Sequence, residues 1–274
     1  MKTIRQLTKR ILNLVTFACF FLILFSCIGN QNSQAFAQIQ LQEKAWYKNI
    51  SEIPVPLNYV REKNDTTTFG YYLQHLPLKT DNNTVYLYNK TPKYNQSAQF
   101  VIIKIDVGTQ DLQQCADAVM RLRGEYLFNQ KKYNEIHFNF LSDGKPRYYK
   151  DYCKGDHSFK KFRSYMNYIF SYANTASLKK ELNKVDDIKN IKIGDVLIVS
   201  GNPYGHAVTV VDVAKNIEGK IVFMIAQSYM PAQEIHVLKN PNDSEISPWY
   251  DIDFGDVLQT PEWTFRKEDL YRFP

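Results

Sequence analysis

A cysteine and a histidine that lie far apart along the chain are the residues with the clearest capacity for chemistry. Cys115 stands in the stretch "DLQQCADAVMRLR", close to the start of a predicted helix, where unpaired backbone N–H groups favour a thiolate. His206 stands between Gly205 and the apolar stretch "AVTVVDVA", at the start of a predicted strand. A thiol nucleophile needs a base within hydrogen-bonding reach. If the fold brings the two side chains together, they could carry out acyl transfer through a covalent intermediate.

A base of this kind also needs a third group that fixes its tautomer and orientation. Gln227, in "IAQSYMP", ends the next predicted strand, where an antiparallel partner returns to the end of the sheet that holds His206. Glu234 and His236 follow on the next stretch. We therefore expect Gln227 to orient the imidazole of His206.

The helix that carries Cys115 follows directly on the β-branched run 99–108, which predicts a buried strand. Thr109 or Asp111 can cap this helix, and Asp111 with Gln114 three residues later fits the spacing of a capping box. Cys115 would then lie within the first two turns. It would also lie on the apolar face of the helix, so a purely structural role in the core is the alternative interpretation.

A disulfide is a second alternative for this thiol. Cys19 leaves with the predicted targeting segment and Cys27 is the candidate lipid site, so Cys115 and Cys153 remain. Two thiols in an oxidising compartment can form one bridge.

The first 26 residues resemble a bacterial lipoprotein signal. Four basic residues within the first ten precede the apolar stretch 11–25, which is too short for a comfortable membrane span. The stretch "LFSC" then ends at Cys27, the residue that becomes lipidated in such signals. Cleavage after Ala37, in "AFAQ", is the alternative and would release a secreted protein. We expect the domain on the periplasmic side of the cell envelope, held to a membrane through a lipid on Cys27.

Composition narrows the possible partners. The net charge is +6, and loss of residues 1–26 removes four basic residues and no acidic one, which leaves +2. Without a basic stripe, no nucleic-acid partner is expected. His137, His157 and Cys153 lack the tight spacing of a zinc site, and there is no phosphate-binding glycine loop, so we expect neither a metal nor a cofactor.

The remaining 248 residues suit a flexible tether, 27–45, followed by a single domain, 46–274. Stretches 68–79 and 83–90 read as short strands around a turn, and the tail 247–273 reads as loop-rich. Two further helices are predicted at 159–173 and 175–185, and an antiparallel meander is predicted from runs 191–201, 205–214, 220–230 and 233–240.

The cysteine helix followed by "GDVLIVSG", "GHAVTVV" and a strand ending in a polar residue resembles papain-like cell-wall hydrolases of the NlpC and CHAP kind. More closely, about residues 55–273 resemble a bacterial lipoprotein family catalogued as a domain of unknown function. The papain-like resemblance implies an α+β fold in which the cysteine helix packs on an antiparallel sheet. The N-terminal strands extend this core, and a helical and loop insert at about 125–185 shapes the cleft.

The same resemblance implies roles for individual residues. Cys115 would form a thioester, His206 would shuttle the proton, and Gln227 would bond the ring nitrogen away from sulfur. Gln113, Gln114 or the backbone amide of Cys115 would bind the oxyanion. The implied substrate is the peptidoglycan stem peptide, whose amides are exposed in the envelope.

The sequence is also compatible with two other classes of function. The chain could be a non-catalytic envelope protein that keeps this fold for binding or assembly. The same pair of side chains could also transfer acyl groups on lipids or small amides.

Overall fold

The computed structural model describes residues 46–201 and 204–274. The predicted signal segment 1–26, the tether 27–45, Cys27 and Ala37 lie outside the described residues. Residues 47–274 form one compact unit. None of the helices in the described part of the chain combines the length and the apolar character that crossing a membrane requires.

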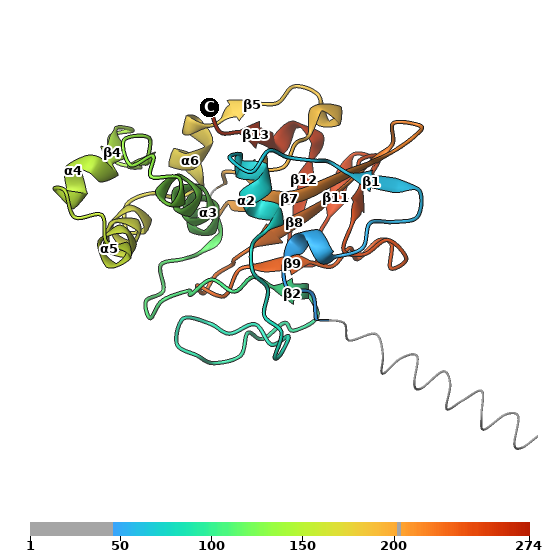
Figure 1. Cartoon of the computed structure of the whole chain (residues 1–274), viewed down its shortest axis with the longest axis horizontal. Coiled ribbons are helices and arrows are strands. Elements are labelled where there is room, and N and C mark those ends of the chain that lie inside the picture. The colour runs from blue at the N-terminus through green and yellow to red at the C-terminus, as the bar shows by residue number, and fades with distance from the viewer. Residues whose placement is uncertain (1–45, 202–203) are drawn as a thin grey trace, which may run out of the picture. The chain divides into compact units, whose positions relative to one another are not determined.

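A nine-stranded antiparallel sheet forms the centre of the domain (Figure 1). Its middle is a meander in which strands that follow one another in the chain pair with their neighbours. β1 adds to β7, and β10 adds to β8, outside the main path. The strand order along the main path is β2 (Gln99–Ile102), β9 (His236–Leu238), β8 (Ile221–Gln227), β7 (His206–Asn216), β6 (Val196–Val199), β13 (Leu270–Arg272) and β5 (Asn183–Lys184), and the two added strands are β1 (Tyr59–Arg61) and β10 (Tyr250–Asp251).

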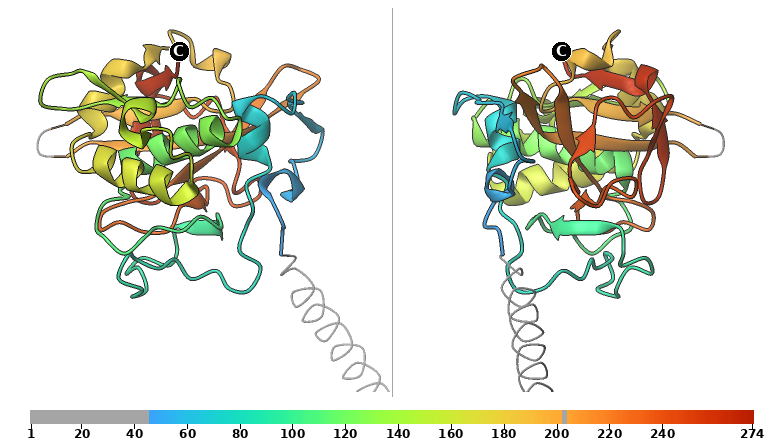
Figure 2. Two further views of the ribbon diagram at one scale, coloured as in Figure 1. Left: turned by 60° about the vertical axis from the view of Figure 1, so that its left-hand side comes forward. Right: turned by 90° about the vertical axis from the view of Figure 1, so that its right-hand side faces the viewer.

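The helices gather on one face of this sheet, as both views of Figure 2 show. On that face α3 packs against β7, and side chains such as Val119, Phe162 and Ala207 share one buried apolar cluster. The opposite face is covered by the C-terminal hairpin, whose Phe265 packs with Val208. The five α-helices of the described residues are α2 (Phe69–Gln74), α3 (Cys115–Asn129), α4 (Tyr149–Cys153), α5 (Phe159–Phe170) and α6 (Thr175–Glu181).

Alternating side chains explain this two-sided arrangement. Successive residues of a strand point to opposite faces, and β7 is buried at every position from His206 to Ala214 because both faces are covered. The smaller elements are the hairpins β3 (His137–Asn139) with β4 (Pro146–Tyr148) and β11 (Val257–Gln259) with β12 (Thr264–Arg266), and the 3-10 turns Ile50–Glu52, Ile188–Asn190 and Lys267–Asp269.

The predicted mixture of helices and an antiparallel sheet is confirmed, and so are the meander and the helices at 159–170 and 175–181. The prediction of a strand at 68–79 is wrong. That stretch forms helix α2, because the hydroxyl of Thr68 caps it by accepting a hydrogen bond from the amide of Tyr71 at 3.2 Å, and the buried residues Gly70, Leu73 and Gln74 recur at helical spacing.

Two other sequence predictions also fail. Stretch 83–90 forms only isolated bridges, at Tyr86 and Leu87, instead of a strand. The tail is not loop-rich, because it supplies β10 to β13 and completes the main sheet through β13. Aromatic and β-branched residues in the tail pack on the sheet and pair with other strands, which a local pattern does not reveal.

The predicted insert, 125–185, has more regular structure than expected. It holds the second half of α3, the hairpin β3–β4 and the helices α4 to α6, which Figure 1 shows grouped on the side of α3. Stretch 129–160 thus includes two strands and a short helix.

Candidate functional site

Cys115 is the first residue of α3 rather than a residue of its second turn. Gln114 is the N-cap, and the carboxylate of Asp117 accepts a hydrogen bond from the Gln114 amide at 3.0 Å. The prediction of a cap at Thr109 or Asp111 is therefore wrong. Asp111 instead accepts hydrogen bonds from the Ala232 amide at 2.7 Å and from the Gln114 side chain at 3.2 Å, so it ties the helix start to the turn after β8.

A cavity of about 420 Å³ opens at this helix start. Cys115 lines it with only 8% of its surface exposed, so the thiol is close to buried but borders reachable space. The start of α6 forms another wall, through Asn174 and Thr175. Tyr204 and Gly205, just before β7, complete the side next to the sheet.

The thiol lies against the chain immediately before His206. The Sγ atom of Cys115 is 3.9 Å from the carbonyl oxygen of Gly205. A Cβ atom at position 205 would lie 2.2 Å from the Val199 carbonyl oxygen and 2.6 Å from the hydroxyl of Thr175. Glycine is required at this position, because any side chain would prevent the strand start from approaching the helix so closely.

His206 begins β7 and is 1% exposed. Its Nε2 atom lies 2.8 Å from the side-chain oxygen of Gln227. Its ring is surrounded by aromatic side chains, with centroid distances of 4.8 Å to Tyr229, 5.2 Å to Trp263 and 5.9 Å to Phe265. The structure thus brings His206 and Gln227 together under an aromatic cover.

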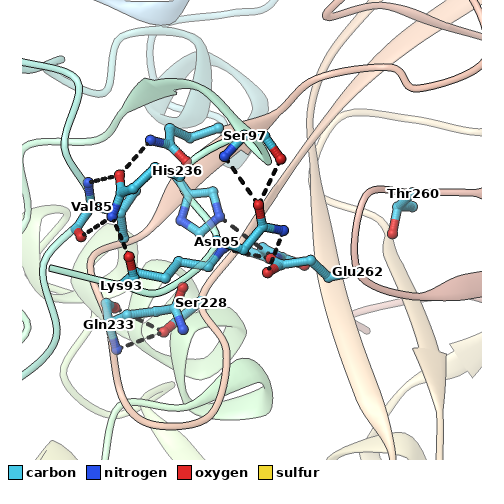
Figure 3. Close-up of polar contacts among 12 residues, drawn as sticks. Val85, Lys93, Asn95, Ser97, Ser228, Gln233, His236, Thr260 and Glu262 are labelled. Atoms are coloured by element: carbon cyan, nitrogen blue, oxygen red, sulfur yellow. Dashed lines mark hydrogen bonds and ion pairs between the residues drawn. The ribbon is translucent and has the colours of Figure 1, made fainter.

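A charged group behind Gln227 fixes the direction of its amide. The Gln227 amide nitrogen donates to the carboxylate of Glu262 at 2.7 Å. Lys93 and Asn95 also donate to that carboxylate, at 2.6 and 3.1 Å (Figure 3). Since the Gln227 nitrogen faces Glu262, its oxygen faces His206, which must then donate from Nε2. The Nδ1 atom of His206 makes no hydrogen bond within the described residues and retains its lone pair.

The thiol and the imidazole are not hydrogen-bonded to each other in the described residues. His206 points to the sheet face covered by Trp263 and Phe265, whereas the next residue, Ala207, packs in the cluster of α3. Cys115 therefore meets the backbone of the strand start, and a direct contact would have to form around the end of the sheet.

The two glutamines expected near the oxyanion lie in different surroundings. Gln113 is buried, its side-chain oxygen accepts from Arg121 at 2.9 Å, and its amide nitrogen has no partner among the described residues. It does not line the cavity. Of the two glutamines, only Gln114 lines the cavity beside the sulfur.

Burial keeps the thiol and the imidazole neutral. It raises the pKa of Cys115 to about 11, with a further increase from the charge of Asp117. It also raises the pKa of Asp117 well above the usual range. Burial lowers the pKa of His206 to about 4, although the hydrogen bond to Gln227 opposes this shift. At neutral pH the resting site holds an uncharged thiol and an uncharged imidazole.

Sequence reasoning missed several residues of this site. Tyr229 lies close to both candidate groups, since its ring contacts His206 and the charges of Glu262 and Cys115 raise its pKa after the larger effect of burial. Its position two residues after Gln227, on the same side of the extended chain, was the available signal. Glu262 and Lys93 carried no local signal, because they come from the tail and from a loop far away in the sequence.

Cys115 and Cys153 are both free thiols in the structure, so the alternative disulfide is not formed. Within 46–201 and 204–274, no three His, Cys, Asp or Glu side chains are grouped in a way that could hold a metal ion.

Comparison with known protein families places the chain in one of them. The family model described as a domain of unknown function (4846) matches residues 50–272, nearly the whole compact unit. The chain belongs to this family. No curated protein matches the chain, and no solved structure does either.

Proposed function

We propose that this member of the 4846 family is a papain-like cysteine hydrolase of the cell envelope that cleaves amide bonds. The observation that carries the proposal is the ordered set of Cys115 at a helix start, His206 at a strand start and Gln227 on the next strand. The thiol borders a cavity, and Gln227 with Glu262 leaves the Nδ1 atom of His206 as the free base. This is the division of roles that a cysteine nucleophile requires.

The neutral resting state determines how the first step would proceed. As the Cys115 sulfur bonds to the carbonyl carbon, its proton passes to Nδ1 of His206, and the imidazolium forms only in that step. Collapse of the tetrahedral intermediate breaks the C–N bond, and the amine leaves with the proton from His206. Water then hydrolyses the thioester by the same route, with His206 as base. These reaction steps require the ring of His206 to reach the Cys115 sulfur when substrate binds.

The oxyanion would be held at the start of α3. The first backbone amides of a helix have no carbonyl partner within it, and Cys115 and Ala116 at the start of α3 line the cavity, so their amides are the proposed donors. The side chain of Gln114 is the additional donor that borders the same space.

The proposed substrate is the stem peptide of peptidoglycan. It follows from the proposed location, in which a lipid on Cys27 holds the domain on the periplasmic side of a membrane, where amides of the wall are the abundant exposed target. The insert would contribute to substrate binding, because α6 forms one wall of the cavity at Cys115. No cofactor takes part in the chemistry.

The direct test uses purified residues 46–274 and soluble muropeptides, with the products identified by mass spectrometry. We expect a cleaved stem peptide and, after rapid acid quenching, a Cys115 acyl adduct. The matched control is Cys115→Ala, which should bind peptides but yield neither product. Absence of turnover together with unchanged binding in both proteins would contradict hydrolysis.

Unchanged peptide binding without turnover would favour a non-catalytic role in binding or assembly. One observation supports this alternative: the thiol pKa of about 11 and the burial of His206 leave no preformed thiolate–imidazolium pair. A binding protein would keep the same cavity and the same affinity in Cys115→Ala.

A further inference from the structure

A second cavity, of about 340 Å³, lies farther along α3. Arg123 lines it, and eight residues separate Arg123 from Cys115, which corresponds to about 12 Å along a helix axis. The other walls come from the hairpin β3–β4, the end of α6 and the last two residues of the chain. None of the residues around this cavity lines the cavity at Cys115.

Arg123 is held in place without being neutralised. Its guanidinium carbon lies over three aromatic rings, at 5.3 Å from the centre of Phe69, 5.5 Å from Tyr126 and 5.2 Å from Phe273. It makes no hydrogen bond and no ion pair with any described residue, although it is half-buried and burial lowers its pKa. A fixed guanidinium with unused donors matches a carboxylate or a phosphate in shape and charge.

Three other side chains offer unused hydrogen-bonding atoms around the same space. The hydroxyl of Tyr148 has no partner within the described residues, and His137 uses only Nδ1, which lies 3.0 Å from the Glu135 carbonyl oxygen. One carboxylate oxygen of Glu181 accepts from the Asn139 amide and the other makes no such bond. Burial raises the pKa of Glu181 to about 7, as expected for a carboxyl group that lacks a cation.

The floor beneath these groups is apolar. Leu127 and Phe138 are buried and line the cavity, so a ligand would be held by a few polar contacts above a hydrophobic surface. The carboxyl groups of Glu181 and Glu135 on the walls disfavour a doubly charged phosphate. A single carboxylate accompanied by an ammonium group complements both signs of charge.

We propose that this cavity binds a small zwitterion of the size of an α-amino acid, with its carboxylate on Arg123 and its ammonium group on Glu181. Tyr148 and His137 add hydrogen bonds to the carboxylate side. The site does not depend on the proposed hydrolase activity, because it shares no lining residue with the cavity at Cys115.

Titration calorimetry on residues 46–274 at pH 8 tests the proposal. The probes are L-alanine, D-alanine and L-glutamate as zwitterions, with sodium acetate, ethylamine and inorganic phosphate as single-charge or polyanionic controls. We expect millimolar or tighter binding of at least one amino acid and binding of each control about tenfold or more weaker, since each control lacks one of the two contacts or carries excess negative charge.

Variants assign the contacts. Arg123→Lys keeps the cation but loses the two-pronged geometry, and Glu181→Gln removes the partner of the ammonium group, so each should weaken amino-acid binding about tenfold or more. Tyr148→Phe removes one hydroxyl, leaves the fold undisturbed and should weaken binding severalfold. Arg266→Lys, at an exposed arginine of β12, is the matched control and should leave binding unchanged.

Two results would overturn the proposal. One is that phosphate or acetate binds as tightly as every amino acid tested. The other is that Tyr148→Phe and Glu181→Gln, folded as judged by their melting curves, bind amino acids as the unaltered protein does.

Discussion

The domain contains two buried free cysteines, Cys115 and Cys153, and they differ in their contact with an imidazole, in their access to a cavity and in the partners around them. Cys153 has the closer contact, 3.7 Å from its Sγ to the Nδ1 atom of His157. It ends α4, donates to the Lys150 carbonyl at 3.5 Å and is 2% exposed within an apolar cluster. His157 is exposed and stacks on Tyr133 at 4.0 Å.

Cys115 lacks such a contact but has the other requirements of a nucleophile. It starts a helix of 15 residues, faces unpaired backbone amides and borders a cavity. Its candidate base is held by Gln227 and Glu262, whereas no described side chain except Cys153 hydrogen-bonds His157. Distance between sulfur and nitrogen is therefore a poor guide to function, because access and the partners of each group decide what the pair can do.

The largest difference between the two sites should appear on loss of the sulfur. Cys115→Ala should lower muropeptide hydrolysis by about 10³-fold or more, as removal of a covalent nucleophile does. Cys153→Ala should change it by less than about twofold, with only a modest loss of stability from the small core cavity. Steady-state kinetics on both variants would measure this difference, and circular dichroism would check that both are folded. An inactive Cys153→Ala and an active Cys115→Ala would contradict the assignment of Cys115 as nucleophile.

The second-largest effect on hydrolysis should come from Glu262, whose carboxylate accepts a hydrogen bond from the Gln227 amide. Glu262→Gln removes the negative charge and replaces one acceptor oxygen by an NH2 donor, so the Gln227 amide is no longer held in one orientation and His206 can present the wrong tautomer. We therefore expect kcat to fall about 10- to 100-fold with little change in KM. Glu234→Gln is the control, because Glu234 pairs with Lys79 at 2.5 Å and does not bond Gln227. Since Glu262→Gln leaves Lys93 buried without its anion, the double variant Lys93→Met/Glu262→Gln should show the same loss of kcat. Normal kcat in both would exclude the positioning role.

The burial of His206 should make the stability of the fold depend on pH. The pKa of His206 falls from 6.5 to about 4 on folding, so the folded protein is favoured above pH 6.5 and this contribution is lost as the pH falls towards 4. At pH 5 it amounts to about 2 kcal/mol relative to pH 7. His206→Gln should flatten urea-unfolding free energies between pH 7 and 5 by that amount, and an unchanged slope would contradict the prediction. His236, whose pKa burial lowers to about 3, adds to the slope in both proteins.

The smallest effect is expected at the thiol's acidic neighbour. Asp117 raises the pKa of Cys115 through its charge, so Asp117→Asn should speed iodoacetamide alkylation of Cys115 several-fold near pH 9 while its amide oxygen keeps the helix cap. Cys153 serves as the internal control in the same peptide map and should be labelled slowly in both proteins. An unchanged rate at Cys115 would show that burial alone governs its reactivity.

Much of the site's layout was readable along the chain, and the reason is local. Runs of β-branched residues broken by glycine predict the meander, and a polar residue at the end of one run must lie near the start of its antiparallel neighbour, so Gln227 could be paired with His206. The helix start was misplaced by about one turn, since Asp111 looks like a cap but bonds to the turn at Ala232, and no local pattern reveals that contact.

Contacts between distant segments decided the rest. Glu262 reaches Gln227 across 35 residues, Lys93 reaches Glu262 across 169, and the aromatic cover of His206 comes from a tail that locally resembles a loop. The burial that makes the thiol a weaker acid and the imidazole a weaker base is a property of the packed domain, and it opposes the activating influence of the helix start.

The sequence by itself determined most element types of the core and the order of Cys115, His206 and Gln227, because element types depend on periodicity. The tertiary structure alone decided which face of the sheet each side chain occupies, which charges stand behind the imidazole, and the presence of a second polar cavity at Arg123. Those properties arise from desolvation and from long-range pairing, which are set only when segments distant in the chain pack together.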